Sequence, residues 1–163
     1  MYFHGKGVVQ DAAESARLHR LAADQGHPGA IFNLGICYRD GTGVPQDHAA
    51  AFAHFRRAAE LGDLGAMAGL AVCYQDGEGT AVDYAQAMRW ARRAADQGRA
   101  GAMNTVGALY AMGQGVPADR AEAVRWYERA AVAGDDVAKA NLRRHAAAGF
   151  APAAAALRRL GLE

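Results

Sequence analysis

Small and apolar residues recur along the chain at the spacing of amphipathic helices, and the helical stretches come in pairs separated by glycines. Between Ala66 and Tyr74 the small and apolar positions fall on one helical face. Gly77 and Gly79 interrupt this run, because glycine adopts positive φ without steric cost and so ends helices. A second helical run follows and ends near Gly98. The pattern therefore predicts two short helices joined by a tight loop.

This two-helix pattern repeats with a fixed period. Tyr38, Tyr74 and Tyr110 lie 36 residues apart (74 − 38 = 36; 110 − 74 = 36), and a glycine pair follows each at the same distance. A period of about 20 to 50 residues is typical of a stacked repeat array. The sequence therefore predicts an all-α solenoid, an α-α superhelix of helix-turn-helix repeats. We divide it into a partial repeat at 1–28, repeats at 29–64, 65–100 and 101–136, and a half repeat with a capping helix at 137–163.

Aspartate marks the start of each second helix. Asp47, Asp83 and Asp119 share one phase of the repeat, where a carboxylate can accept from free N–H groups of the first helical turn. Asp11 has this phase too, so we expect residues 2–10 to form the end of a first helix and its loop. Because most of that first helix is missing, we expect a fragment of a longer array or a frayed N-terminus. An uncovered face there would favour end-to-end self-association.

The repeated residues resemble a known family. One unit reads L-G-x-x-Y-x-x-G-x-G-V-x-x-D from Leu34 to Asp47, and second helices add A-x-x-W-x-x-x-A-A-x-x-G. This pattern is similar to the Sel1-like repeat, a relative of the tetratricopeptide repeat, and extends from about residue 2 to about residue 144. Ala71, Val106 and His54 depart from it locally. The resemblance implies a right-handed superhelix whose first helices form a concave, partner-binding surface.

Charge and composition disfavour several classes of protein. The chain has 163 residues, 52% of them hydrophobic, and a formal net charge of +1. So small a charge gives no bulk attraction to nucleic acid or to an anionic membrane. No stretch approaches the roughly 18 apolar residues of a membrane-spanning helix, and the start lacks the pattern of a signal peptide. We therefore expect a cytoplasmic protein with neither nucleic acid nor membrane as a partner.

Residues that could carry chemistry are sparse. Cys37 and Cys73 are the only cysteines, and they lie one full repeat apart, too far for a disulfide, so we expect free buried thiols. The six histidines are scattered without metal-ligand spacing, and the Gly-x-Gly loops follow helices rather than strands. The single serine, Ser15, has no base at a suitable spacing. The sequence therefore predicts no metal, no cofactor and no catalysis.

Arginines are concentrated on the second helices. We expect a solvated outer face, while a stripe that binds an acidic partner or nucleic acid is the alternative. The spacing of four residues allows three local ion pairs: Arg20 with Asp24, Arg56 with Glu60 and Arg92 with Asp96.

The first helices carry the positions that differ most between units, and the resemblance places these positions on the concave surface. Asn33 and Asn141 share one phase, with Thr105 between them. An asparagine amide can both donate to and accept from the backbone of an extended peptide, although these residues could also be simply solvated. The candidate partner-binding residues are Phe32, Asn33, Ile36, Arg39, Val72, Gln75, Asp76, Asn104, Thr105, Ala108, Met112, Asn141 and Arg144.

We predict from these features a scaffold or adaptor that binds a protein or peptide segment in its concave groove, without catalysis. An apolar floor with a polar rim suits a segment with a few apolar anchors. Two alternatives stay open. One is a structural repeat segment of a larger signalling or regulatory protein. The other is a hydrolase of the β-lactamase type, which the resemblance to some family members suggests and which the lack of a nucleophile disfavours.

Overall fold

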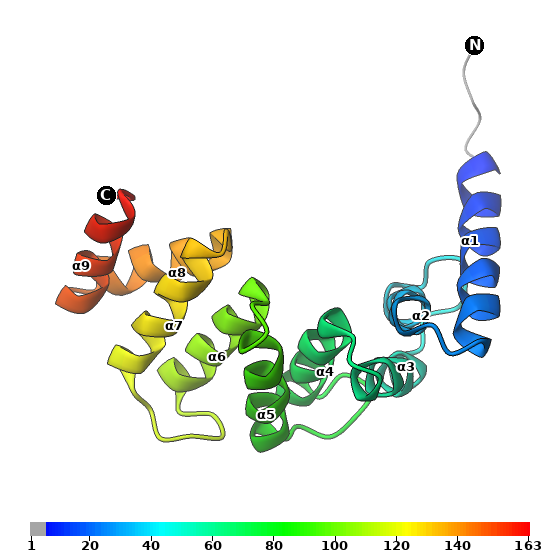
Figure 1. Ribbon diagram of the computed structural model, residues 1–163, viewed down its shortest axis with the longest axis horizontal. Coiled ribbons are helices and arrows are strands. Elements are labelled where there is room, and N and C mark those ends of the chain that lie inside the picture. Colours follow the sequence, from blue (N-terminus) through cyan, green and yellow to red (C-terminus); the bar gives the residue numbers. More distant parts are fainter. Residues whose placement is uncertain (1–5) are drawn as a thin grey trace, which may run out of the picture. The chain divides into compact units, whose positions relative to one another are not determined.

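The computed structural model describes residues 6–163, and over this range the chain contains helices and turns but no strand, which confirms the predicted all-α fold (Figure 1). Residues 1–5 lie outside the described range, and with them part of the first-helix end and loop expected at 2–10. The helices are α1 (Lys6–Asp24), α2 (Pro28–Asp40), α3 (His48–Glu60), α4 (Leu64–Asp76), α5 (Tyr84–Ala95), α6 (Ala100–Met112), α7 (Arg120–Val132), α8 (Asp136–Ala147) and α9 (Ala151–Leu160).

These helices group into two compact units, Met1–Val82 and Asp83–Glu163. The described part of the first unit holds α1 to α4, and the second holds α5 to α9. Within each unit, consecutive helices pack on one another. In the second unit α6 also contacts α8, and α7 contacts α9 (Figure 1). First helices (α2, α4, α6, α8) and second helices (α1, α3, α5, α7, α9) therefore alternate along the chain, as the repeat predicts.

Aspartate side chains cap five of the described helices, α3, α4, α5, α7 and α8. Asp47, Asp83 and Asp119 each accept a hydrogen bond from the backbone N–H three residues on, at 2.9, 3.0 and 2.9 Å, which confirms their predicted capping role. Asp63 and Asp135 cap the first helices α4 and α8 in the same way, both at 2.7 Å, which the sequence analysis missed. A cap of this kind stabilises a helix by about 1 kcal/mol.

The predicted cap at Asp11 is wrong. Helix α1 already begins at Lys6, so Asp11 lies inside the helix, and so do Gly7 and Val8, which we expected in a loop. In later repeats the loop is held by contacts with an earlier second helix. Helix α1 instead runs without interruption through the phase at which the later repeats have their loop.

A glycine of the first helix receives the aromatic ring of the second helix. Phe55 of α3 is 1% exposed and lies so close to Gly35 of α2 that a Cβ at Gly35 would come within 2.7 Å of the ring. In the second unit, Gly107 of α6 meets Tyr127 of α7 in the same way, at 2.8 Å. A side chain at either glycine would push the two helices apart. Glycine therefore permits close approach of the paired helices in both units.

The second glycine of each loop ties one repeat to the repeat before it. Gly79 has a φ of +72°, and a Cβ there would overlap the carbonyl oxygen of His48, the first residue of α3. Gly43 makes the same contact with α1, and Gly115 with the start of α5. Both the left-handed backbone and the lack of space exclude a side chain, so the Gly-x-Gly loops are structural turns.

The three predicted ion pairs on the second helices are wrong. Over the described range, none of the arginines at 20, 56 and 92 pairs with the carboxylate four residues on. Instead, Arg20 Nη2 donates to the Tyr38 hydroxyl at 2.8 Å, and Arg92 Nη1 lies 3.4 Å from the Tyr110 hydroxyl. Each bond joins a second helix to the first helix that follows it. The hydroxyls of Tyr38 and Tyr110 therefore accept hydrogen bonds from two of the three arginines that we expected to pair with a carboxylate.

The two tryptophans share one position of the repeat but are buried to different extents. Trp126 is 2% exposed and belongs to the core, whereas Trp90 remains partly exposed with the Arg93 guanidinium 5.4 Å from the centre of its ring. The last helix forms where expected, with Pro152 in its first turn, and it buries an apolar face against α7 and α8.

Two substitutions beside one ring test the packing. Gly35 and Gly69 lie on opposite sides of the Phe55 ring, and a Cβ at Gly69 would lie 3.6 Å from it, an ordinary contact. We expect Gly35→Ala to lower the free energy of unfolding by about 1 to 3 kcal/mol through overpacking. Gly69→Ala should raise it by about 0.5 to 1 kcal/mol, because alanine is the better helix former. Urea denaturation of both variants measures this, and effects of the same sign would contradict the packing.

Candidate functional site

The candidate partner-binding residues lie on the first helices, and none of them is fully buried. Those of the first unit belong to α2 and α4, and those of the second unit to α6 and α8. Each unit therefore presents its own first-helix face.

In the first unit, Phe32 is engaged in packing. The centre of its ring lies 5.7 Å from that of Phe55, and a Cβ at Gly65 of α4 would approach the Phe32 ring to 2.9 Å. Phe32 therefore helps to hold α2, α3 and α4 together while part of its surface stays exposed.

The other candidate residues of the first unit differ in their contacts and in their exposure to solvent. Arg39 donates to the neighbouring Asp40 from Nε at 2.7 Å and from Nη2 at 3.1 Å. The Arg39 guanidinium holds the pKa of the Asp40 carboxyl below its usual value, so this pair is locally neutral. The other candidates of the first unit are exposed (Asn33, Val72, Asp76) or partly exposed (Ile36, Gln75).

In the second unit, three polar side chains form one hydrogen-bonded chain. Asn141 of α8 donates from Nδ2 to Oδ1 of Asn104 on α6 at 2.9 Å, and Arg144 donates from Nη2 to Oδ1 of Asn141 at 3.0 Å. This row differs from the predicted one by a residue, because the Thr105 hydroxyl donates to the Gly101 carbonyl of its own helix at 3.1 Å. We name the chain of Asn104, Asn141 and Arg144 the amide row.

The amide row lies beside apolar surface. Met112, at the end of α6, is 54% exposed, and Ala108 is partly exposed one turn before it. Over residues 6–163 no protein acceptor faces the Asn104 amide nitrogen, which leaves it able to donate to a ligand. Held donors of this kind lower the ordering cost of binding an extended backbone.

The two cysteines are free and buried, as predicted. Burial raises the pKa of the Cys73 thiol to about 11, and the carboxylate of Glu78 adds to this shift. Because the thiolate is the reactive form, Cys73 is a poor nucleophile at neutral pH. Its role is packing within the first unit.

The remaining chemistry is limited over the described residues. No cluster of three or more His, Cys, Asp or Glu side chains there could hold a metal ion. Likewise, none of the helices found between residues 6 and 163 has the length and apolarity needed to cross a bilayer.

The sequence analysis missed a buried polar pair in the second unit. The Tyr127 hydroxyl and His145 Nε2 are buried without a hydrogen-bond partner in the protein, and the centres of the two rings lie 5.7 Å apart. His145 has the phase of Leu109 (145 − 109 = 36), which is buried, so the repeat could have indicated an inward histidine.

This burial predicts a pH dependence of stability. Burial lowers the pKa of His145, and the charges of Arg120 and Arg144 lower it further. A histidine with a lowered folded-state pKa binds its proton more tightly in the unfolded chain, so stability is present above the unfolded pKa of about 6.5 and is lost as the pH falls through it. We expect the free energy of unfolding to fall from pH 7.5 to 5.5, and less steeply in His145→Gln. Equal slopes in urea titrations of both proteins would contradict this.

Comparisons with known proteins identify the repeat. The Sel1 repeat family model matches residues 1–27, 28–63, 65–98 and 100–135. A search of curated protein sequences gave no match.

Solved structures give a similar result. The crystal structure of c5321, a protective antigen present in uropathogenic Escherichia coli strains displaying an SLR fold, is 38% identical with a TM-score of 0.75 and matches 80% of this chain and 28% of that one. A Sel1 repeat protein from Oxalobacter formigenes is 37% identical with a TM-score of 0.78, over 85% of this chain and 56% of that one. Helicobacter pylori cysteine rich protein B shares the fold at 19% identity with a TM-score of 0.62, over 84% and 98% of the two chains. The match thus spans 28% and 56% of the lengths of the first two.

Proposed function

The chain belongs to the Sel1 repeat family, and we propose that it is a scaffold or adaptor that binds a peptide or protein segment on the exposed faces of its first helices. Proteins built from this repeat generally mediate protein–protein interactions and are typically non-catalytic. For this chain, the proposal is that binding needs no cofactor, no metal and no catalytic group.

The amide row is the observation that supports this proposal most. It joins α6 and α8 through side chains that retain donor groups, and the exposed Met112 lies two helical turns beyond Asn104 on α6. An extended segment could place a backbone carbonyl at the Asn104 amide and an apolar side chain on Met112, which combines polar orientation with an apolar anchor. In the first unit, Asn33, Val72 and Gln75 form the corresponding face.

A variant of the amide row tests the proposal. A peptide selected from a random display library against the whole chain serves as the ligand, and calorimetry gives its Kd for each variant. We expect Asn141→Ala to weaken binding about fivefold or more, because a hydrogen bond contributes about 1 kcal/mol. Its melting temperature should stay within about 4 °C of that of the parent. Phe32→Ala is a poor test because Phe32 also packs on Phe55.

Matched controls lie on the second helices. Arg57→Ala and Arg93→Ala remove exposed side chains without touching the first-helix faces. If these two variants lose binding while Asn141→Ala keeps it, the binding face is on the second helices and the proposal is wrong.

The other parts of the sequence prediction remain proposals. End-to-end self-association is supported by the apolar side chains of Leu18 and Leu21 on α1, which are 52% and 49% exposed. The alternative, a structural segment of a larger regulatory protein, is compatible with the matched share of the first two structural relatives, 28% and 56% of their length. A cytoplasmic location and the division into repeats at 29–64, 65–100 and 101–136 stay predictions.

A further inference from the structure

A surface hollow of about 610 Å³, largely open to solvent and called the cavity below, lies on the second unit and is lined by none of the candidate partner-binding residues. Its volume lies within the range of roughly 300 to 1,000 Å³ that small-ligand and side-chain pockets span. The lining residues are Met103 of α6 and Arg125, Glu128, Arg129, Val132 and Ala133 of α7.

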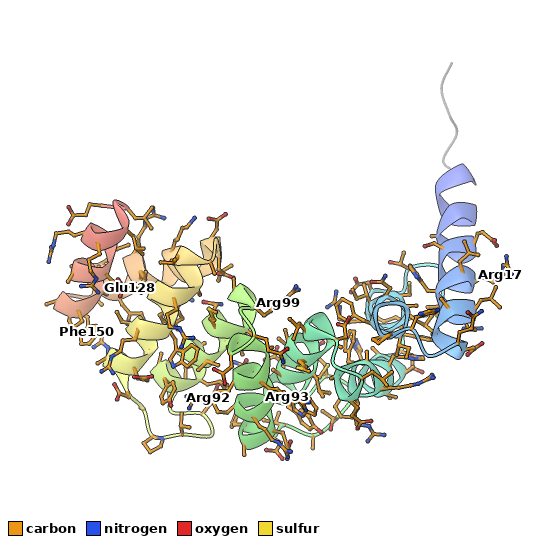
Figure 2. The ribbon with its side chains drawn as sticks, in the orientation of Figure 1. Arg17, Arg92, Arg93, Arg99, Glu128 and Phe150 are labelled. Atoms are coloured by element: carbon orange, nitrogen blue, oxygen red, sulfur yellow. The ribbon has the colours of Figure 1, made fainter. Side chains whose placement is uncertain are left out.

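The charge available in this cavity is positive. Its single acid, Glu128, is already engaged by Arg159 of α9, which donates to the two carboxylate oxygens at 2.7 and 2.8 Å (Figure 2 labels Glu128). Arg125 lies 3.0 Å from the Glu122 carboxylate. Over the described residues, Arg129 has no carboxylate within ion-pairing distance. An anionic group entering the cavity therefore meets one guanidinium without a carboxylate partner.

Arg129 is also held in place. Its Cζ lies 4.1 Å from the centre of the Trp126 ring, and Trp126 is 2% exposed and donates from Nε1 to Glu122 at 3.0 Å. A guanidinium that stacks on an aromatic face keeps its N–H donors in the ring-parallel plane, where they can bind a carboxylate through two hydrogen bonds. The contact with the Trp126 ring thus restricts the movement of the Arg129 guanidinium before a ligand arrives.

The rest of the lining is apolar. Val132 is 72% exposed, Ala133 beside it is exposed, and Met103, which is 8% exposed, comes from α6. Exposed apolar groups next to a cationic one suit a ligand that carries an aliphatic side chain near a carboxylate.

We propose that this cavity is a second docking site, separate from the first-helix faces, for a protein segment in which an acidic residue lies beside an aliphatic one. The carboxylate binds Arg129, and the aliphatic side chain covers Val132 and Met103. Charge complementarity selects this occupant, because the sole acid of the lining is neutralised within the protein. The inference goes beyond the proposed function, since it adds a surface on a second helix.

Methionine methyl signals separate the two surfaces. In protein labelled with ¹³C at the methionine methyl groups, Met103 reports on the cavity and Met112 on the amide-row face, with each signal assigned from a Met→Leu variant. The probe is a soluble peptide of alternating Glu and Leu, and the control peptides carry Lys for Glu or Gln for Leu. We expect the Glu-Leu peptide, at up to about 1 mM, to shift Met103 saturably and to leave Met112 unchanged.

Variants decide whether Arg129 carries the site. Arg129→Met keeps an unbranched stem over Trp126 but removes the charge, and it should weaken the Kd for the Glu-Leu peptide about tenfold, the change expected for one charge-assisted hydrogen bond. Arg93→Met removes a guanidinium stacked on Trp90, outside the cavity lining, and should have no effect (Figure 2).

Several results would overturn the proposal. These are no shift of Met103 with the Glu-Leu peptide, an equal shift with the Lys-Leu peptide, or unchanged affinity in Arg129→Met. A single-stranded oligonucleotide that shifts Met103 more strongly than the peptide would assign the cavity to nucleic acid instead. A shift of Met112 alone would reject the cavity and leave the first-helix proposal standing.

Discussion

The contact between a glycine of one helix and an aromatic ring of the next is the constraint on which each unit depends. Gly35 receives Phe55 and Gly107 receives Tyr127, at would-be Cβ distances of 2.7 and 2.8 Å. A helix of about 13 residues is marginal alone in water, so its stability comes from such packing rather than from propensity. The packing of each unit therefore depends on the fit between a glycine and a ring.

This packing determines which surfaces remain for binding. With the small residues and rings turned toward neighbouring helices, the first helices keep polar side chains outward, and in the second unit Asn104 and Asn141 lie close enough to bond at 2.9 Å. On the second helices the outward-facing polar residues are mainly arginines, and several of them contact aromatic side chains. They bond to tyrosine hydroxyls or stack on tryptophan, as Arg129 does on Trp126. The same close helix packing therefore determines the first-helix faces and the arginine-bearing faces of the second helices. On both, neighbouring side chains hold the polar donor groups in place before any partner binds.

The sequence predicted the fold because its signals are local and repeated. Glycine pairs, capping aspartates and a 36-residue period specify two helices and a turn without knowledge of the rest of the chain. The cap at Asp11 failed because the backbone is already helical from Lys6 on, which a local motif does not report. The pair Arg92–Asp96 failed for a related reason, since Tyr110 lies beyond the range of an i,i+4 rule. The predicted row of polar residues contained Thr105 where the structure has Asn104, because the partner of a side chain on a packed helix depends on how far the two helices are shifted along each other. The repeat pattern gave no sign of the cavity beside Arg129.

A double-mutant cycle between Gly107 and Tyr127 tests the central claim most directly. The free energy of unfolding is measured for Gly107→Ala, Tyr127→Ala and the double variant. If the glycine is there to receive the ring, Gly107→Ala destabilises the parent by about 1 to 3 kcal/mol but clearly less once Tyr127 is alanine, because the ring contacts at 2.8 Å are then gone and the tight contact with the Ala123 carbonyl oxygen at 3.1 Å remains. An equal cost of Gly107→Ala in both backgrounds would show that the ring does not require the glycine, and would contradict this account of the fold.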